Sequence, residues 1–253
     1  MHWRVLIAVL ALVTLAAGKA SAQTVPDGDP ALPTCPESEP AVVSATPPPI
    51  PSRVEGPSGV VALTFDAGAD RGYAQDILDT LSDAGIPATF GMTGRWAMAN
   101  PELVQRMASD GHMVINHTFD HQSFTGLSDR LGGLSADWRR YELVQADAII
   151  APLIGHTTCP WYRLPYFDGD RSVVGDVAEA GYTQQVGWTI DTLGWRGSSV
   201  QNILSRSLRL AAPNAVYVLH VGVQSHDGPA LPSIVEGLKD MGYGFATVAT
   251  LGE

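Results

Sequence analysis

The chain has 253 residues, with 15 Lys and Arg against 26 Asp and Glu, and its formal net charge is −11. This acidity argues against nucleic acid as a partner, because a phosphate backbone selects a basic surface, and it also disfavours adsorption to anionic lipid. The length allows one domain of ordinary size beside flanking segments.

Residues 1–22 have the pattern of a secretory signal peptide. Arg4 supplies a positive charge, residues 5–17 form an apolar core, and Ala-Ser-Ala at 20–22 is a small-residue cleavage site. The apolar core is too short for a stable membrane anchor, although an uncleaved anchor is the alternative. We therefore expect a protein that is secreted, periplasmic or bound to the cell wall, without stable membrane insertion after cleavage.

Residues 23–56 form a proline-rich linker or tail without helical or strand periodicity. Such a segment favours extended conformations and cannot bury enough apolar surface to fold alone. It contains Cys35, and the other cysteine of the chain is Cys159. Export makes a disulfide between them plausible, with two independent thiols as the alternative.

Residues 57–253 form a single domain in which strand and helix patterns alternate. The first helix is indicated by apolar Ile77, Leu78 and Leu81 on one face and ends at Gly85, and Asn100 is expected to cap a helix that starts at Pro101. The remaining helices are expected around 139–153, 173–180, 199–210 and 234–238, and the strands at 60–65, 88–92, 112–116, 184–190, 215–219 and 245–248. The alternation predicts an α/β fold, a distorted or incomplete (β/α) barrel of about seven units.

Side chains able to do chemistry follow four of the strand patterns directly. They are Asp66, His117, Asp191 and His220. The carboxyl ends of parallel strands meet at one face of a barrel, where catalytic groups collect. This placement indicates an enzyme.

His117 and His121 are four residues apart. On a helical turn both imidazoles would fall on one face, close enough to bind one metal ion. Alone, such a pair is a weak signal, and its other interpretation is two polar turn residues.

The other reactive side chains suggest a general acid/base set. Asp66 is placed to act as general base and His220 to protonate a leaving group, with Asp191 orienting that imidazole. Arg163 could pair with Asp66 and keep it ionised. Each residue also has a structural interpretation: a turn aspartate, a buried histidine, or a loop ion pair.

Five segments carry these residues in order. They read Thr-Phe-Asp-Ala-Gly at 64–68, His-Thr-Phe-Asp-His at 117–121, Arg-Leu-Pro-Tyr at 163–166, Asp-Thr-Leu-Gly-Trp at 191–195 and Leu-His at 219–220. Together they resemble the motifs of the polysaccharide deacetylases, carbohydrate esterases that remove N-acetyl groups from chitin, chitooligosaccharides or peptidoglycan. The resemblance covers essentially the whole domain.

The resemblance implies a role for each matching residue. Asp66 would be the general base paired with Arg163, and His220 the general acid tuned by Asp191. The residues that would bind a divalent metal, most commonly zinc, are His117 and His121; those that would bind substrate are Tyr166 through its backbone amide, and Trp195 and Leu219 as walls of the acetyl pocket.

Two positions depart from the family pattern. The family's third metal ligand is the second aspartate of the first motif, where this chain has Ala67, and Gly194 replaces the second aspartate of the fourth motif. Catalytic zinc sites normally have three protein ligands. Asp70 is the expected substitute and Asp120 a weaker one; alternatively Asp66 ligates the metal directly and another base is used.

The leading hypothesis is a secreted, monomeric deacetylase that acts on an N-acetylglucosamine-containing polysaccharide by metal-assisted acid/base catalysis. One alternative is an amidase of a small non-sugar amide that uses little or no metal. The other is a carbohydrate-binding homologue whose catalysis is impaired by Ala67.

Overall fold

The computed structural model describes residues 59–68 and 70–251. The expected signal peptide, the proline-rich segment and Cys35 lie outside the described residues, so cleavage and the disulfide to Cys159 stay predictions. Within the described part of the chain, no helix is long and apolar enough to span a membrane.

A curved sheet of parallel strands forms the centre of the domain. Its strands follow the order β5-β4-β3-β2-β1-β7-β6, and β8 pairs with the start of β1. The strands are β1 (Val60–Ala67), β2 (Thr89–Met92), β3 (Met113–Asn116), β4 (Trp161–Tyr162), β5 (Gln184–Gln185), β6 (Ile190–Asp191), β7 (Val216–His220) and β8 (Gly244–Phe245). The predicted distorted (β/α) barrel is confirmed.

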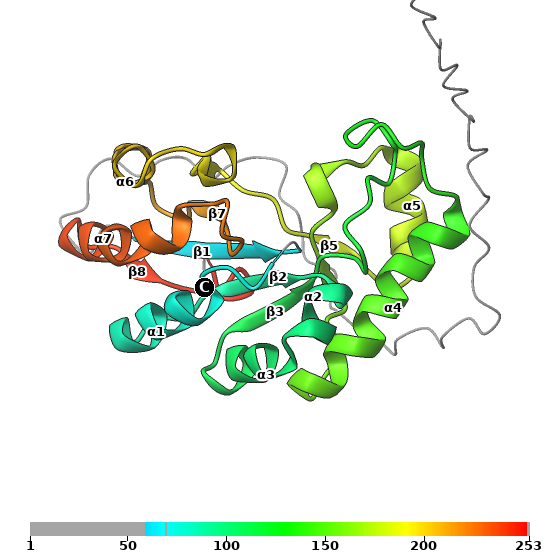
Figure 1. The fold of residues 1–253 in the computed structure, drawn as a ribbon, viewed down its shortest axis with the longest axis horizontal. Helices are drawn as coiled ribbons and strands as arrows, with labels where there is room; N and C mark the ends of the chain where they lie inside the picture. The colour runs from blue at the N-terminus through cyan, green and yellow to red at the C-terminus, as the bar shows by residue number, and fades with distance from the viewer. Residues whose placement is uncertain (1–58, 69, 252–253) are drawn as a thin grey trace, which may run out of the picture.

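Helices cover the outside of this sheet. Figure 1 shows α4 and α5 near one end of the molecule and α6 and α7 near the other. The helices are α1 (Ala74–Ala84), α2 (Gly94–Ala99), α3 (Pro101–Ser109), α4 (Ala136–Ile154), α5 (Arg171–Glu179), α6 (Val200–Arg209) and α7 (Asp227–Asp240), with short 3₁₀ turns η1 (Pro165–Phe167) and η2 (Gly194–Arg196).

Most helices form where the apolar spacing predicts them, but α2 has no counterpart among the predicted helices and α7 begins at Asp227, before the expected 234. In α1 the side chains of Ile77, Leu78 and Leu81 are fully buried, and Gly85 ends the helix at φ +65°, a conformation that favours glycine. Asn100 occupies the predicted N-cap position of α3, with Pro101 in the first turn, but its side chain makes no capping hydrogen bond, because its amide donates to the Trp96 carbonyl of the preceding helix.

The expected strand at 184–190 is instead two short strands at opposite edges of the sheet, β5 and β6. The segment between them loses its ladder because the Val186 and Gly187 carbonyls accept hydrogen bonds from the Arg163 side chain. Since only four residues join the two edges, the sheet must curl until its edges approach each other. This segment therefore closes the barrel and brings Arg163 to its centre.

Candidate active site

Asp66 and His220 lie side by side on neighbouring parallel strands. In the strand register Asp66 of β1 pairs with His220 of β7 on one side and with Gly91 of β2 on the other. Paired residues of adjacent strands project to the same face, so the two side chains enter one space at the carboxyl ends of the strands. A Cβ atom at position 91 would lie 2.6 Å from Asp66 Oδ1, so glycine leaves the carboxylate its room.

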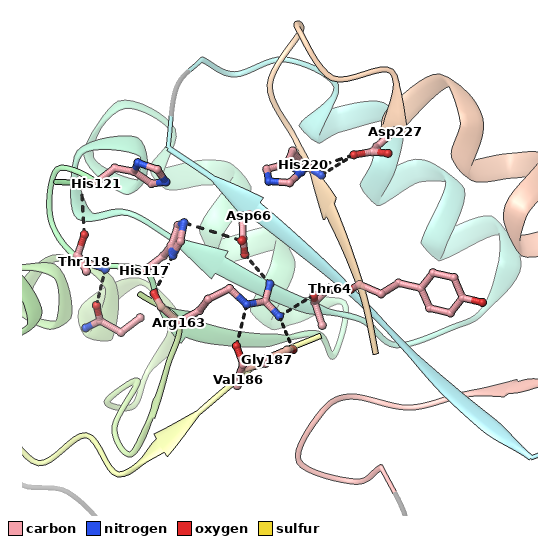
Figure 2. A network of polar contacts seen from close by, with 12 residues as sticks. Thr64, Asp66, His117, Thr118, His121, Arg163, Val186, Gly187, His220 and Asp227 are labelled. Carbon is pink, nitrogen blue, oxygen red and sulfur yellow. Dashed lines mark hydrogen bonds and ion pairs between the residues drawn. The ribbon is translucent and has the colours of Figure 1, made fainter. Parts of the chain in front are cut away.

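Arg163 holds Asp66 from below, as Figure 2 shows. Its Nη1 donates to Asp66 Oδ1 at 2.8 Å, and its Nη2 donates to Thr64 Oγ1 at 2.9 Å. Its remaining donors bond the carbonyls of the segment that closes the barrel, Nε to Val186 at 3.0 Å and Nη2 to Gly187 at 3.2 Å. These hydrogen bonds fix the guanidinium in a single orientation. They also supply protein partners for a charged group that is only 1% exposed to water.

This arrangement keeps Asp66 ionised. Burial raises the pKa of its carboxyl group, but the Arg163 guanidinium, with His117 and His220 acting in the same direction, outweighs burial and holds the pKa below its ordinary value. The predicted pairing of Asp66 with Arg163 is present. An ionised, buried carboxylate facing a cavity can accept a proton from a bound water.

The segment with the two histidines is a strained loop, so the expected helical turn is wrong. Thr118 and His121 have φ of +69° and +68°, which costs a β-branched or bulky residue of order 1–3 kcal/mol. The loop is held by side chains: Asn116 Oδ1 accepts from the Thr118 amide, and Glu142 Oε2 accepts from the Phe119 and Asp120 amides. This bend, not helical spacing, brings the two imidazoles together, with ring centroids 4.9 Å apart.

His117 and His121 are both in the neutral protonation state that metal binding requires. Nδ1 of His117 donates to the Arg163 carbonyl at 2.8 Å, because a carbonyl can only accept, and this leaves Nε2 free in the neutral ring. Burial lowers the pKa of both rings, that of His121 to about 4. The two imidazoles are therefore neutral at neutral pH, as metal ligands must be.

The third ligand is missing from the described residues, which contain no cluster of three or more His, Cys, Asp or Glu side chains able to hold one ion. The structure does not bring Asp70 to the histidines: Oδ1 of Asp70 accepts from the Val223 amide at 2.9 Å. Asp120 bonds Gln122 and approaches Arg95. Ala67 lies in the apolar core. The donor set thus fits a divalent metal through two imidazoles and lacks the third protein ligand of a usual catalytic zinc site.

His220 faces a carboxylate that the sequence did not reveal. Its Nδ1 lies 3.7 Å from Oδ2 of Asp227, and its backbone amide donates to the same oxygen at 2.9 Å. Burial lowers the pKa of His220, but the Asp227, Asp66 and Asp191 carboxylates outweigh burial and hold the pKa above its ordinary value. His220 therefore remains a proton donor to higher pH than a free histidine.

The expectation that Asp191 orients His220 is not supported by its contacts. Oδ1 of Asp191 accepts from the Leu193 amide at 2.8 Å, and Oδ2 accepts from Trp195 Nε1 at 3.2 Å. Asp191 therefore positions Trp195 and acts on His220 only through its charge. The sequence offers only a weak signal for Asp227: it is an aspartate seven residues after His220, in the segment before the helix expected at 234–238.

Two adjoining cavities of about 260 and 350 Å³ contain these side chains. Both are lined by Asp66, His117, His121, Trp195 and His220. Tyr166, half exposed, lines the larger one, with Arg163, Asp191 and the aromatic rings of Phe167 and Trp188. The predicted wall residue Leu219 is fully buried in the apolar core, and its neighbour Val218 lines the cavity instead.

The fold and the site define a class of protein: a parallel α/β barrel hydrolase in which an ionised carboxylate and an imidazole share one cavity. The polysaccharide deacetylase family model matches residues 53–185, so the chain belongs to the polysaccharide deacetylase family, and the resemblance seen in its five segments is confirmed. Family members are hydrolases of amide bonds and are generally metal-dependent. Asp191 and His220 lie beyond the residues that the model matches.

Known proteins similar to this chain include peptidoglycan deacetylases. A peptidoglycan-N-acetylglucosamine deacetylase of Bacillus cereus is 30% identical over 194 residues, covering 76% of this chain and 67% of that protein. The structure of the Bc1960 peptidoglycan N-acetylglucosamine deacetylase matches with a TM-score of 0.69 at 29% identity, covering 78% of this chain and 90% of that one.

A third similar structure is a mutant of BA3943, a CE4 family pseudoenzyme with restored enzymatic activity. It matches with a TM-score of 0.68 at 25% identity, covering 77% of this chain and 68% of that one. The chain is therefore similar both to a protein named as a deacetylase and to a mutant pseudoenzyme whose activity was restored.

Proposed function

We propose that this protein is a secreted or cell-wall-associated hydrolase that removes N-acetyl groups from an N-acetylglucosamine-containing polysaccharide, peptidoglycan or a chitin-like polymer. The observation that carries the proposal is the facing pair of Asp66, held ionised by Arg163, and His220, whose pKa nearby carboxylates hold above its ordinary value. One group can accept a proton and the other can donate one within the same cavity. The relatives named as peptidoglycan deacetylases and the signal pattern at residues 1–22 support the substrate class and the location.

The chain's own residues supply both proton transfers. Asp66 accepts a proton from a water as that water attacks the acetamide carbonyl. His220 donates a proton to the departing sugar amine, which makes the amine a better leaving group. The backbone amide of Tyr166 would stabilise the negative oxygen that forms on the carbonyl.

A divalent metal such as zinc would be held by His117, through its Nε2 atom, and by His121. When bound it would polarise the carbonyl and lower the pKa of a coordinated water. With Ala67 at the position of the missing ligand, two imidazoles should hold zinc more weakly than the usual three-ligand set. We therefore expect activity to depend on the concentration of added metal.

A second candidate is a binding homologue with impaired catalysis. The absent third ligand and the similarity to a pseudoenzyme favour it. Against it, a protein that only binds sugar has no use for a carboxylate held ionised beside an imidazole of raised pKa. A metal-poor amidase of a small amide would keep this acid/base pair and differ in substrate.

Acetate release from N-acetylglucosamine oligomers and from peptidoglycan tests the proposal, with the purified protein first chelated and then titrated with zinc. We expect release that returns as zinc is added. The matched variant Ala67→Asp should bind zinc at least about tenfold more tightly by calorimetry, since it restores a third ligand. No release from either substrate at any zinc concentration, by the protein as it stands, would refute the deacetylase function and favour the binding homologue.

A further inference from the structure

Asp227 is a buried carboxylate without an evident structural need. It lies in the first turn of α7 and is 0% exposed. Its Oδ2 accepts from the His220 amide at 2.9 Å and from the Ser225 hydroxyl at 2.7 Å, while its Oδ1 has no hydrogen-bond partner. Burying a carboxylate with an oxygen left unpaired is costly, so a role that needs the charge is indicated.

That charge is directed at His220. Nδ1 of the imidazole lies 3.7 Å from Asp227 Oδ2 and is itself buried without a hydrogen-bond partner, while the ring lines the cavity that contains Asp66. Figure 2 shows Asp227 behind His220, on the side away from Asp66. A carboxylate behind an imidazole stabilises the imidazolium and fixes which nitrogen faces the substrate.

The carboxylate of Asp227 fills the space that opens at Gly194. A Cβ atom built at position 194 would lie 2.4 Å from Asp227 Oδ1, 2.5 Å from its Cγ and 2.6 Å from its Oδ2. Position 194 is where the fourth family motif has its second aspartate. A side chain at 194 and the carboxylate of Asp227 are therefore mutually exclusive.

We propose that Asp227 is the positioning residue of the general acid His220 and stands in for the carboxylate that the fourth motif lacks at Gly194. The proposal rests on the proposed function for the role of His220 but not for the contact itself. The titratable groups that face His220 are Asp66 from β1, Asp191 from β6, Asp227 from α7, and His117 and His121 from the loop after β3. Of the three carboxylates, Asp227 alone makes a side-chain contact with the imidazole, whereas Asp191 is engaged by Leu193 and Trp195.

The first test is an NMR titration of the His220 ring in the purified protein. Asp227→Asn keeps the shape of the side chain and its acceptor oxygen but removes the charge, and it should weaken proton binding by His220 by about tenfold or more, one pKa unit. Asp191→Asn is the matched control and should weaken it by less than about threefold. An effect of Asp191→Asn equal to or larger than that of Asp227→Asn would overturn the proposal.

The second test moves the carboxylate. Asp227→Ala should lose the raised proton affinity of His220. Adding Gly194→Asp to Asp227→Ala should restore that affinity to within about threefold of the original protein. The alkaline limb of the kcat/KM profile should shift and return in the same way. A folded double variant that titrates like Asp227→Ala alone would show that residue 194 and Asp227 are not equivalent. If the double variant does not fold, the comparison of the two Asn variants still decides the proposal.

The titration needs no turnover. A protein that releases no acetate but shows the Asp227-dependent titration of His220 would refute the deacetylase function and support this inference. Acetate release, together with a His220 titration that is unchanged in Asp227→Asn, would support the deacetylase function and refute this inference.

Discussion

On each side of the active site a carboxylate packs against a glycine, but the two carboxylates differ in their hydrogen-bond partners. On the base side, Asp66 lies over Gly91 and is bonded by Arg163, which is in turn bonded by Thr64. On the acid side, Asp227 lies over Gly194 and keeps one oxygen without a partner. On the base side, Asp66 and Arg163 both stand at positions of the family motifs, whereas on the acid side the fourth motif has Gly194 and the carboxylate comes from α7.

The difference shows that a catalytic position can be kept in space while it moves in sequence. On this proposal His220 needs a negative charge behind its ring, and either position 194 in η2 or Asp227 in α7 can carry it. Asp66 is less replaceable, because its neighbours on both strands and Arg163 all depend on its position. We therefore expect changes on the base side to have the larger effects.

Removing the base should have the largest effect. Asp66→Asn keeps the hydrogen bond from Arg163 but cannot accept a proton, so kcat/KM for acetate release should fall by about 10²–10⁴. Asp227→Asn should cost only about tenfold at neutral pH, since His220 is still present. Asp240→Asn, an exposed change at the end of α7, is the control. A larger loss for Asp227→Asn than for Asp66→Asn would invert the comparison.

The loop that carries the histidines should make stability depend on pH. Burial raises the pKa of Glu142, which holds this loop, from 4.5 to about 7. The folded protein then binds this proton more tightly than the unfolded chain, so between about pH 4.5 and 7 the free energy of unfolding should fall as pH rises, by at most about 3 kcal/mol. Glu142→Gln keeps the acceptor for the loop amides and should remove this component.

Urea denaturation at pH 5 and pH 7.5 measures that change. The exposed Glu179→Gln on α5 is a matched control and should leave the pH dependence as it is. A Glu142→Gln protein with the pH dependence of the original would mean that Glu142 is ionised in the folded state.

Replacing either Gly91 or Gly194 by alanine should lower the folding stability by a similar amount, and this is the smallest of the expected effects. Gly91→Ala and Gly194→Ala each place Cβ 2.4–2.6 Å from a carboxylate oxygen, and such overpacking costs about 1–3 kcal/mol of folding stability. Gly175→Ala in α5 meets nothing within 4 Å and should stabilise the helix by about 0.5–1 kcal/mol. Thermal melts compare the three; a neutral Gly194→Ala would mean that Asp227 moves aside freely.

The base side could be predicted from the sequence because its parts are local. The pattern of 60–65 predicts β1 and puts Asp66 at its end, and Arg163 stands in a motif whose partner is known from the resemblance. The partner of His220 could not be predicted, because in the sequence Asp227 looks like any loop aspartate before the helix expected at 234–238. What selects it is the empty volume at Gly194, which depends on how η2 and α7 pack.

The misplaced strand at 184–190 has a similar cause. Its sequence is suited to a strand, but a strand also needs neighbours to bond its carbonyls, and a side chain distant in sequence takes two of them. The histidine loop fails the helical expectation because the Asn116 and Glu142 side chains bond its amides in another shape. In both cases a long-range polar side chain overrides the local pattern.

The short strands β5 and β6 also affect how copies of this protein meet in solution. The outermost strands of a sheet present unpaired amides and carbonyls that another chain can extend, which is a common start of aggregation. Here each outer strand of the main sheet order is two residues long, and the chain passes directly from one to the other. A concentrated solution of the protein should therefore resist strand-to-strand association, a useful property for an enzyme that is expected to work outside the cell without chaperones nearby.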